Sequence, residues 1–65
     1  MPLTNPLTAK ERSYLEDALQ MENLGIAKCS VYTDQCQNQA LRSLLTDVAR
    51  NKRHHANQIK QLLSQ

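Results

Sequence analysis

Aromatic residues and turn-forming residues are scarce in this sequence. Its 65 residues include no Phe, no Trp, two Tyr, one Gly and two Pro. Sheets favour β-branched and aromatic residues, so this composition argues against strands and predicts helices. A chain of this length forms at most one domain, and its core rarely supplies more than about 3–5 kcal/mol unless a disulfide, a metal or a partner contributes.

A long apolar run is also missing. No segment approaches the roughly 20 residues that cross a bilayer, and residues 1–5 lack the basic and apolar regions of a signal peptide. We therefore expect neither a membrane span nor secretion through a signal peptide. Cys29 and Cys36 lie seven residues apart, about 10.5 Å along a helix, which is too far for a bridge between them. We therefore expect both thiols to be reduced and the protein to be intracellular.

Charge is divided unevenly between the two halves of the chain. Residues 1–37 carry three Lys or Arg against five acids, a net charge of −2. Residues 38–65 carry five Lys or Arg against one acid, a net charge of +4. Two antiparallel helices of opposite sign attract each other weakly, and salt screens that attraction.

Two helices separated by a short polar break are predicted. Thr8–Glu11 has the pattern of a capping box, so the first helix should span about residues 9–35. Before it, residues 1–7 hold both Pro and are expected to form an extended arm. Asn38 suits the N-cap of a second helix over about residues 39–63. Because so short a connection makes the helices antiparallel neighbours, the predicted fold class is all-α, an antiparallel helical hairpin.

Each predicted helix carries an apolar stripe along its length. A hairpin of two helices leaves half of that apolar surface in water, so we expect a second copy to cover it in an antiparallel four-helix bundle. The predicted dimer core consists of Leu15, Leu19, Ile26, Leu41, Leu44, Leu45, Val48, Ile59 and Leu62. The same stripes also contain Ala18, Gly25, Cys29, Tyr32, Cys36 and Leu63.

Three polar residues interrupt these stripes near one level of the hairpin. If the chain bends about residue 37, Glu22 and Lys52 are equally far from the bend, and His55 is one turn further away. A buried carboxylate needs a partner, so Glu22 is expected to pair with Lys52 or His55. The alternative is that Glu22 reaches water at the edge of its stripe and that His55 is an ordinary hydrogen-bonded core residue.

The same residues carry a family resemblance. An acid on one helix, followed by Glu-x-x-His on the next, is the half-site of ferritin-like di-iron carboxylate bundles. Met21–Tyr32 resembles the first-helix pattern of rubrerythrin-like proteins, and Ala49–Ala56 resembles their Ala-Glu-Glu-Glu-Arg-Glu-His-Ala run. The resemblance implies that Glu22 and His55 occupy ligand positions, whereas Lys52 replaces a ligand Glu. Because a cation repels a metal ion, we expect a vestigial site with no metal, no cofactor and no catalytic residue.

Within this superfamily the chain resembles the short spore coat protein F-like (CotF-like) family. The motifs are Leu-Thr-x-x-Glu-x-x-Tyr-Leu-Glu-Asp from Leu7, the Cys36-Gln-Asn-Gln-Ala-Leu41 turn, and the His-His-x-x-x-Ile-x-x-Leu-Leu end. The similarity covers about residues 7–63. It implies a structural protein, not an enzyme, located in the spore coat or the cytoplasm of an endospore-forming bacterium. Its implied partners are a second copy and other spore coat proteins.

Two other functions stay open at this point. One is a metal-binding or di-iron oxidoreductase module formed between two chains by Glu22 and His55. The other is nucleic-acid binding through Arg50 and Arg53 of the basic second helix. No aromatic residue accompanies these arginines, so an ordinary solvated face is the favoured interpretation of the basic run.

Overall fold

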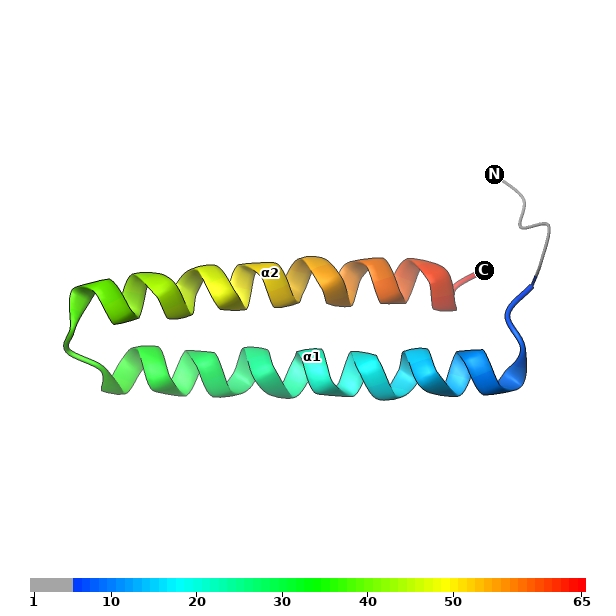
Figure 1. The fold of residues 1–65 in the computed structure, drawn as a ribbon, viewed down its shortest axis with the longest axis horizontal. Coiled ribbons are helices and arrows are strands. Elements are labelled where there is room, and N and C mark those ends of the chain that lie inside the picture. The colour runs from blue at the N-terminus through cyan, green and yellow to red at the C-terminus, as the bar shows by residue number, and fades with distance from the viewer. Residues whose placement is uncertain (1–5) are drawn as a thin grey trace.

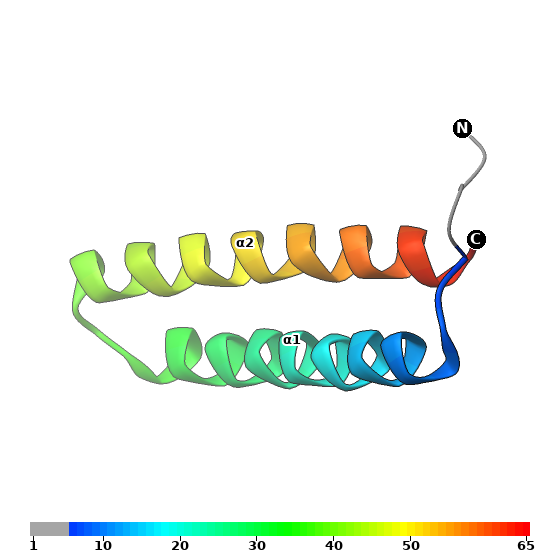
Figure 2. The ribbon, with the colours of Figure 1, turned by 45° about the vertical axis from the view of Figure 1, so that its right-hand side comes forward.

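The fold is two antiparallel helices joined by a short loop. The computed structural model describes residues 6–65, in which α1 spans Ala9–Gln35 and α2 spans Gln39–Leu63. The helices lie side by side along their length (Figure 1; Figure 2). The predicted all-α hairpin and the bounds of both helices are therefore confirmed. The first five residues of the predicted arm over residues 1–7 fall outside the described part of the chain.

Both helices begin at the capping residues that the sequence indicated. The Thr8 hydroxyl accepts a hydrogen bond from the Glu11 amide at 3.0 Å, and the Glu11 carboxylate accepts one from the Thr8 amide at 2.9 Å. At the start of α2, the Asn38 side-chain oxygen accepts from the Leu41 amide at 2.9 Å. These bonds satisfy backbone N–H groups that have no partner inside the first turn of a helix.

The C-terminal end of each helix is bound by an arginine of the other helix. Arg42 donates to the carbonyl oxygens of Thr33 at 2.6 Å and Cys36 at 3.1 Å, at the end of α1. Arg12 donates to the carbonyl oxygen of Leu63 at 2.8 Å, at the end of α2. Carbonyl groups in the last turn lack helical partners and carry the negative end of the helix dipole, so both guanidinium groups stabilise the pairing.

Small residues occupy the interior between the two helices. Cys29, Ala49 and Ala56 are the buried residues of the described chain, with exposed fractions of 6%, 7% and 3%. Eight large apolar side chains stay substantially exposed: Tyr14, Met21, Leu24, Val31, Tyr32, Leu41, Leu44 and Leu62. Stable domains bury their apolar surface between at least two layers, whereas these two helices form only one layer (Figure 2). The single hairpin therefore leaves much of its apolar surface uncovered.

The inward-facing lines differ in part from the predicted stripes. The sequence placed Tyr32 and Leu44 on the stripes, part of which a second copy is expected to cover, and they are 47% and 59% exposed in the single chain. Ala49 and Ala56 were not assigned to the stripes, yet they are buried. The physical reason is that two helices approach most closely along a line of small residues, and larger side chains flank that line. No helix in residues 6–65 is long and apolar enough to span a membrane.

Candidate functional site

Glu22 on α1 and His55 on α2 meet midway along the hairpin. The imidazole Nδ1 lies 3.4 Å from Glu22 Oε2. The Glu22 side chain is 20% exposed and that of His55 is 56% exposed. Oε2 itself is buried and has no hydrogen-bond partner, so the contact is one of charge when the imidazole is protonated. A buried carboxylate oxygen with so little compensation is costly.

Lys52 takes a different place from the one the sequence predicted. The ion pairs within residues 6–65 are Glu22 with His55 and Asp47 with Arg50, and they do not include Lys52. Its side chain instead runs across Gly25, where an added Cβ would lie 2.7 Å from Lys52 Cε and 3.0 Å from its Nζ. The absence of a side chain at Gly25 therefore lets the Lys52 side chain lie close to the backbone of α1.

Relative to the prediction, α2 is shifted along α1 by about one helical turn. A bend at residue 37 would place Glu22 opposite Lys52, but the structure places Glu22 beside His55 and Gly25 beside Lys52. Two of the residues that connect the helices have extended backbones: Cys36 has φ −88° and ψ 138°, and Asn38 has φ −67° and ψ 121°. The extended connection carries the chain past the end of α1 before α2 begins (Figure 2), so His55 lies at the level of Glu22.

One chain does not assemble the donor set of a metal site. Among residues 6–65, no group of three or more His, Cys, Asp and Glu residues is placed to hold an ion. Glu22 and His55 supply one carboxylate and one imidazole, whereas bundle metal sites draw carboxylates and histidines from several helices. The Lys52 side chain at the adjacent turn adds a positive charge. The residues of a single hairpin therefore do not fit a di-iron centre.

Cys29 and Cys36 are both free thiols. Cys29 is buried against α2, where it occupies the place of a small apolar residue. Cys36 lies at the C-cap of α1 and is half-buried. Neither thiol belongs to the pair formed by Glu22 and His55.

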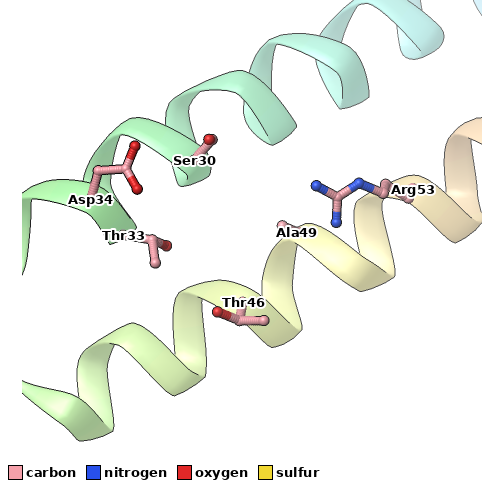
Figure 3. A pocket seen from close by; sticks show the side chains of 6 residues that line it. All are labelled: Ser30, Thr33, Asp34, Thr46, Ala49 and Arg53. Atoms are coloured by element: carbon pink, nitrogen blue, oxygen red, sulfur yellow. The ribbon is translucent and has the colours of Figure 1, made fainter.

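A polar hollow lies between the helices nearer the loop, on the side that α1 presents through Ser30 and Asp34 (Figure 3). Its lining residues are Ser30, Thr33, Asp34, Thr46, Ala49 and Arg53. Arg50, from the same basic run as Arg53, forms an exposed pair with Asp47 at 3.0 Å. A carboxylate therefore accompanies Arg50 and weakens its attraction for a polyanion, whereas no ion pair among the described residues includes Arg53.

Sequence reasoning missed the two arginines that bind helix ends. The last turn of α1 contains no basic residue, so a cation that binds its carbonyl groups must come from another part of the chain. In an antiparallel hairpin, the first turn of each helix lies beside the last turn of the other. Arg12 and Arg42 each lie in or just after a first turn, and this placement was the available signal.

The fold and this site together define a small helical hairpin with an acid–imidazole pair between its helices. Comparisons of the chain with protein families, with curated proteins and with solved structures give no match. The resemblance to the spore coat protein F-like family therefore stays a prediction drawn from motifs in residues 7–63.

Proposed function

We propose that this protein is a non-catalytic structural protein that acts by self-association, two hairpins forming an antiparallel four-helix bundle of ferritin-like type. The observation that carries the proposal is the exposed apolar surface. Leu24, Leu44 and Met21 are 57%, 59% and 71% exposed, while the buried residues of the described chain, Cys29, Ala49 and Ala56, are all small. Scattered apolar side chains on a surface are ordinary, but a continuous apolar face indicates an interface.

The size of the hairpin suits a stable dimer. A helix of the length of α1, which has 27 residues, is about 40 Å long. Two helices side by side, each about 10 Å wide, then present roughly 800 Å² on one face, which is the contribution of each partner to a standard interface. Burial of this area in a second copy supplies the apolar core that one layer lacks.

Sedimentation equilibrium tests this proposal directly. We expect a dimer at micromolar concentration and a loss of helix content by circular dichroism on dilution, because folding and association are linked. A monomer that keeps its full helix content at nanomolar and micromolar concentrations alike would contradict the proposal.

The finer proposal is that this dimer is a component of a bacterial spore coat. It rests on the motif resemblance over residues 7–63 and, through it, on the assignment to the CotF-like family. Quantitative mass spectrometry of purified spores from the producing organism tests it. The protein is expected in the coat fraction of spores and not in vegetative cells, and the reverse distribution would reject the coat assignment.

A second candidate function is a metal-binding or oxidoreductase module in which two chains each contribute Glu22 and His55. The observation that favours it is the buried Glu22 Oε2, which has no hydrogen-bond partner. A dimer doubles the number of carboxylates and imidazoles available at that level of the bundle. The positive charge of Lys52 opposes this candidate, because it repels a divalent ion.

A thermal-shift titration with Mn²⁺, Fe²⁺ and Zn²⁺ separates the two candidates. The structural proposal expects no shift for the wild type. Lys52→Glu recreates Glu-x-x-His with His55, so this variant should lose stability through carboxylate repulsion and regain it with metal. Lys52→Gln is the matched control, because it removes the cation without adding a ligand charge. Stoichiometric metal binding by the wild type would favour the second candidate.

A further inference from the structure

The exposed apolar residues of α1 form a second stripe, distinct from its inward-facing line. At about 100° per residue, Tyr14, Met21, Leu24, Val31 and Tyr32 fall within an arc of about 100°. The centre of this arc lies about 105° round the helix from buried Cys29. Helix α1 is therefore apolar on two adjacent sides, which is the pattern of a helix that contacts two neighbours.

Helix α2 has a matching stripe. Leu41, Leu44 and Leu62 fall within about 60° of arc, about 110° round from the line of Ala49 and Ala56. In both helices the rotation from the buried line to the stripe runs against the direction of increasing residue number. Because the helices are antiparallel and face each other, rotations of the same sense bring both stripes to one side of the hairpin. We call this side the apolar face.

Three charged residues lie within the arc of the α1 stripe: Lys10 in the first turn of α1, and Asp17 and Lys28, of opposite sign, further along the helix. Asp17 and Lys28 fall in the same arc as Met21 and Leu24, and both are exposed. Neither takes part in an ion pair among residues 6–65. Their positions are symmetric, since the midpoint between them is also the midpoint between Met21 and Leu24.

We propose that a second copy of this chain binds the apolar face with its α1 antiparallel to the first α1, and that reciprocal ion pairs between Asp17 of each chain and Lys28 of the other set the register. A two-fold axis then crosses α1 midway between Met21 and Leu24. Each Met21 packs on Leu24 of the other chain, and each Tyr14 packs on Val31. The inference rests on the proposed dimer and specifies its arrangement.

The second helix fits the same axis. The contacts of Glu22 with His55 and of Gly25 with Lys52 put the level of the axis between residues 54 and 55 of α2. The midpoint between Leu44 and Leu62 is residue 53, within two residues of that level. Each Leu44 therefore packs on Leu62 of the other chain around the same axis.

This arrangement also completes the polar site. Asn51 and His55 of α2 lie on the same stripe as Leu44, and their midpoint is again residue 53. Asn51 of one chain then lies opposite His55 of the other, beside the Glu22 carboxylate. The carboxamide supplies a hydrogen-bond partner that the single chain does not provide to this group.

The competing arrangement stacks α1 of one chain on α2 of the other, with both loops at the same end. Asp17 and Lys28 would then face the α2 stripe, which contains no Asp, Glu, Lys or Arg. Its positions are occupied by Leu41, Leu44, Val48, Asn51, His55, Gln58 and Leu62. Placing these two charges against such a stripe desolvates them without an oppositely charged partner. The pairing of α1 with α1 avoids that cost, because Asp17 and Lys28 each gain a partner of opposite charge.

Charge reversal tests the register. In the dimer, Asp17→Lys and Lys28→Asp each replace both ion pairs by two contacts between like charges. Each variant should therefore raise the dissociation constant by roughly tenfold or more. The double variant restores both pairs and should return within about threefold of the wild type. Glu16→Lys is the matched control, because Glu16 is exposed but points about 100° away from Asp17; it should leave the constant within about threefold. A double variant that associates no better than the single variants overturns the inference.

Distance measurement distinguishes the arrangement of the dimer from its existence. A spin label at Gln37→Cys, with Cys29 and Cys36 replaced by Ala, reports the separation of the two loops. Antiparallel α1 helices place the loops at opposite ends, about 44 Å apart along the bundle at 1.5 Å per residue. A dimer with loops within about 20 Å of each other overturns this arrangement but leaves the proposed self-association intact. A wild-type monomer by sedimentation overturns both.

Discussion

The two broad sides of the hairpin differ sharply in chemistry although the same two helices form them. One side is the apolar face, on which Met21, Leu24 and Leu44 are more than half exposed. The other is the polar side, which contains the hollow lined by Ser30 and Thr46 (Figure 3). A hairpin that worked alone would gain nothing from this asymmetry, because both sides would meet water.

This comparison shows on which side of the hairpin the exposed large apolar residues lie. Cys29, Ala49 and Ala56 let the helices approach closely, but burial of such small side chains stabilises a fold only modestly. The most exposed of the large apolar side chains, such as Met21, Leu24 and Leu44, lie on the apolar face, and their burial would require a partner. Folding stability and assembly are thus expected to be coupled in this protein.

A charge in the apolar face should have the largest effect. Leu24→Asp places a carboxylate in the proposed dimer interface, and we expect the dimer dissociation constant to rise at least about a hundredfold. Thr46→Asp makes the same change on the polar side and should alter it less than about threefold. Sedimentation equilibrium measures both constants. Equal effects of the two substitutions would mean that the two sides do not differ in function.

Loss of the imidazole beside Glu22 should have the next largest effect. His55→Leu removes the ion-pair partner of Glu22, so the free energy of unfolding should fall by about 1–3 kcal/mol in urea titrations. Changing Glu22 and His55 to Leu together should recover most of this loss, because no unpaired buried charge is left. Lys52→Met is the comparison variant and should cost less than His55→Leu. The opposite order would favour pairing of Lys52 with Glu22 in the dimer.

The arginine at the loop end should contribute a smaller amount. Arg42→Met removes the donor to two carbonyl oxygens at the end of α1 and should lower the free energy of unfolding by about 1 kcal/mol. Arg50→Met is the control, since its pair with Asp47 is exposed and should be worth less than about 0.5 kcal/mol. Chemical denaturation resolves the two variants, and equal losses would show that the guanidinium at the loop is not a helix cap.

The smallest effect is expected at Gly25. Gly25→Ala gains about 1 kcal/mol of helix propensity, but the new methyl group displaces the Lys52 side chain. We expect the two effects to leave thermal stability nearly unchanged. In a Lys52→Ala background the full gain should appear, because the space above Gly25 is then open. A full gain in the wild-type background would show that Lys52 gives way without cost.

Local signals in the sequence predicted the helices well because capping is local. Thr8 bonds to Glu11 and Asn38 bonds to Leu41, each across three residues, so the residue pattern alone locates both helix starts. The convergence of an acid and a histidine midway along the hairpin was also predictable from their positions on the stripes. The dimer core named from the sequence stays a prediction, and it left out Met21, Leu24 and Val31 of the apolar face.

The sequence by itself determined two helices, their bounds and a polar level between them, because helix propensity and capping act within a few residues. Only the tertiary structure decided that His55 and not Lys52 contacts Glu22. That choice depends on the extended backbone at Cys36 and Asn38, which shifts one helix against the other by a turn. A one-turn shift leaves every local signal unchanged, so no pattern along the chain could reveal it.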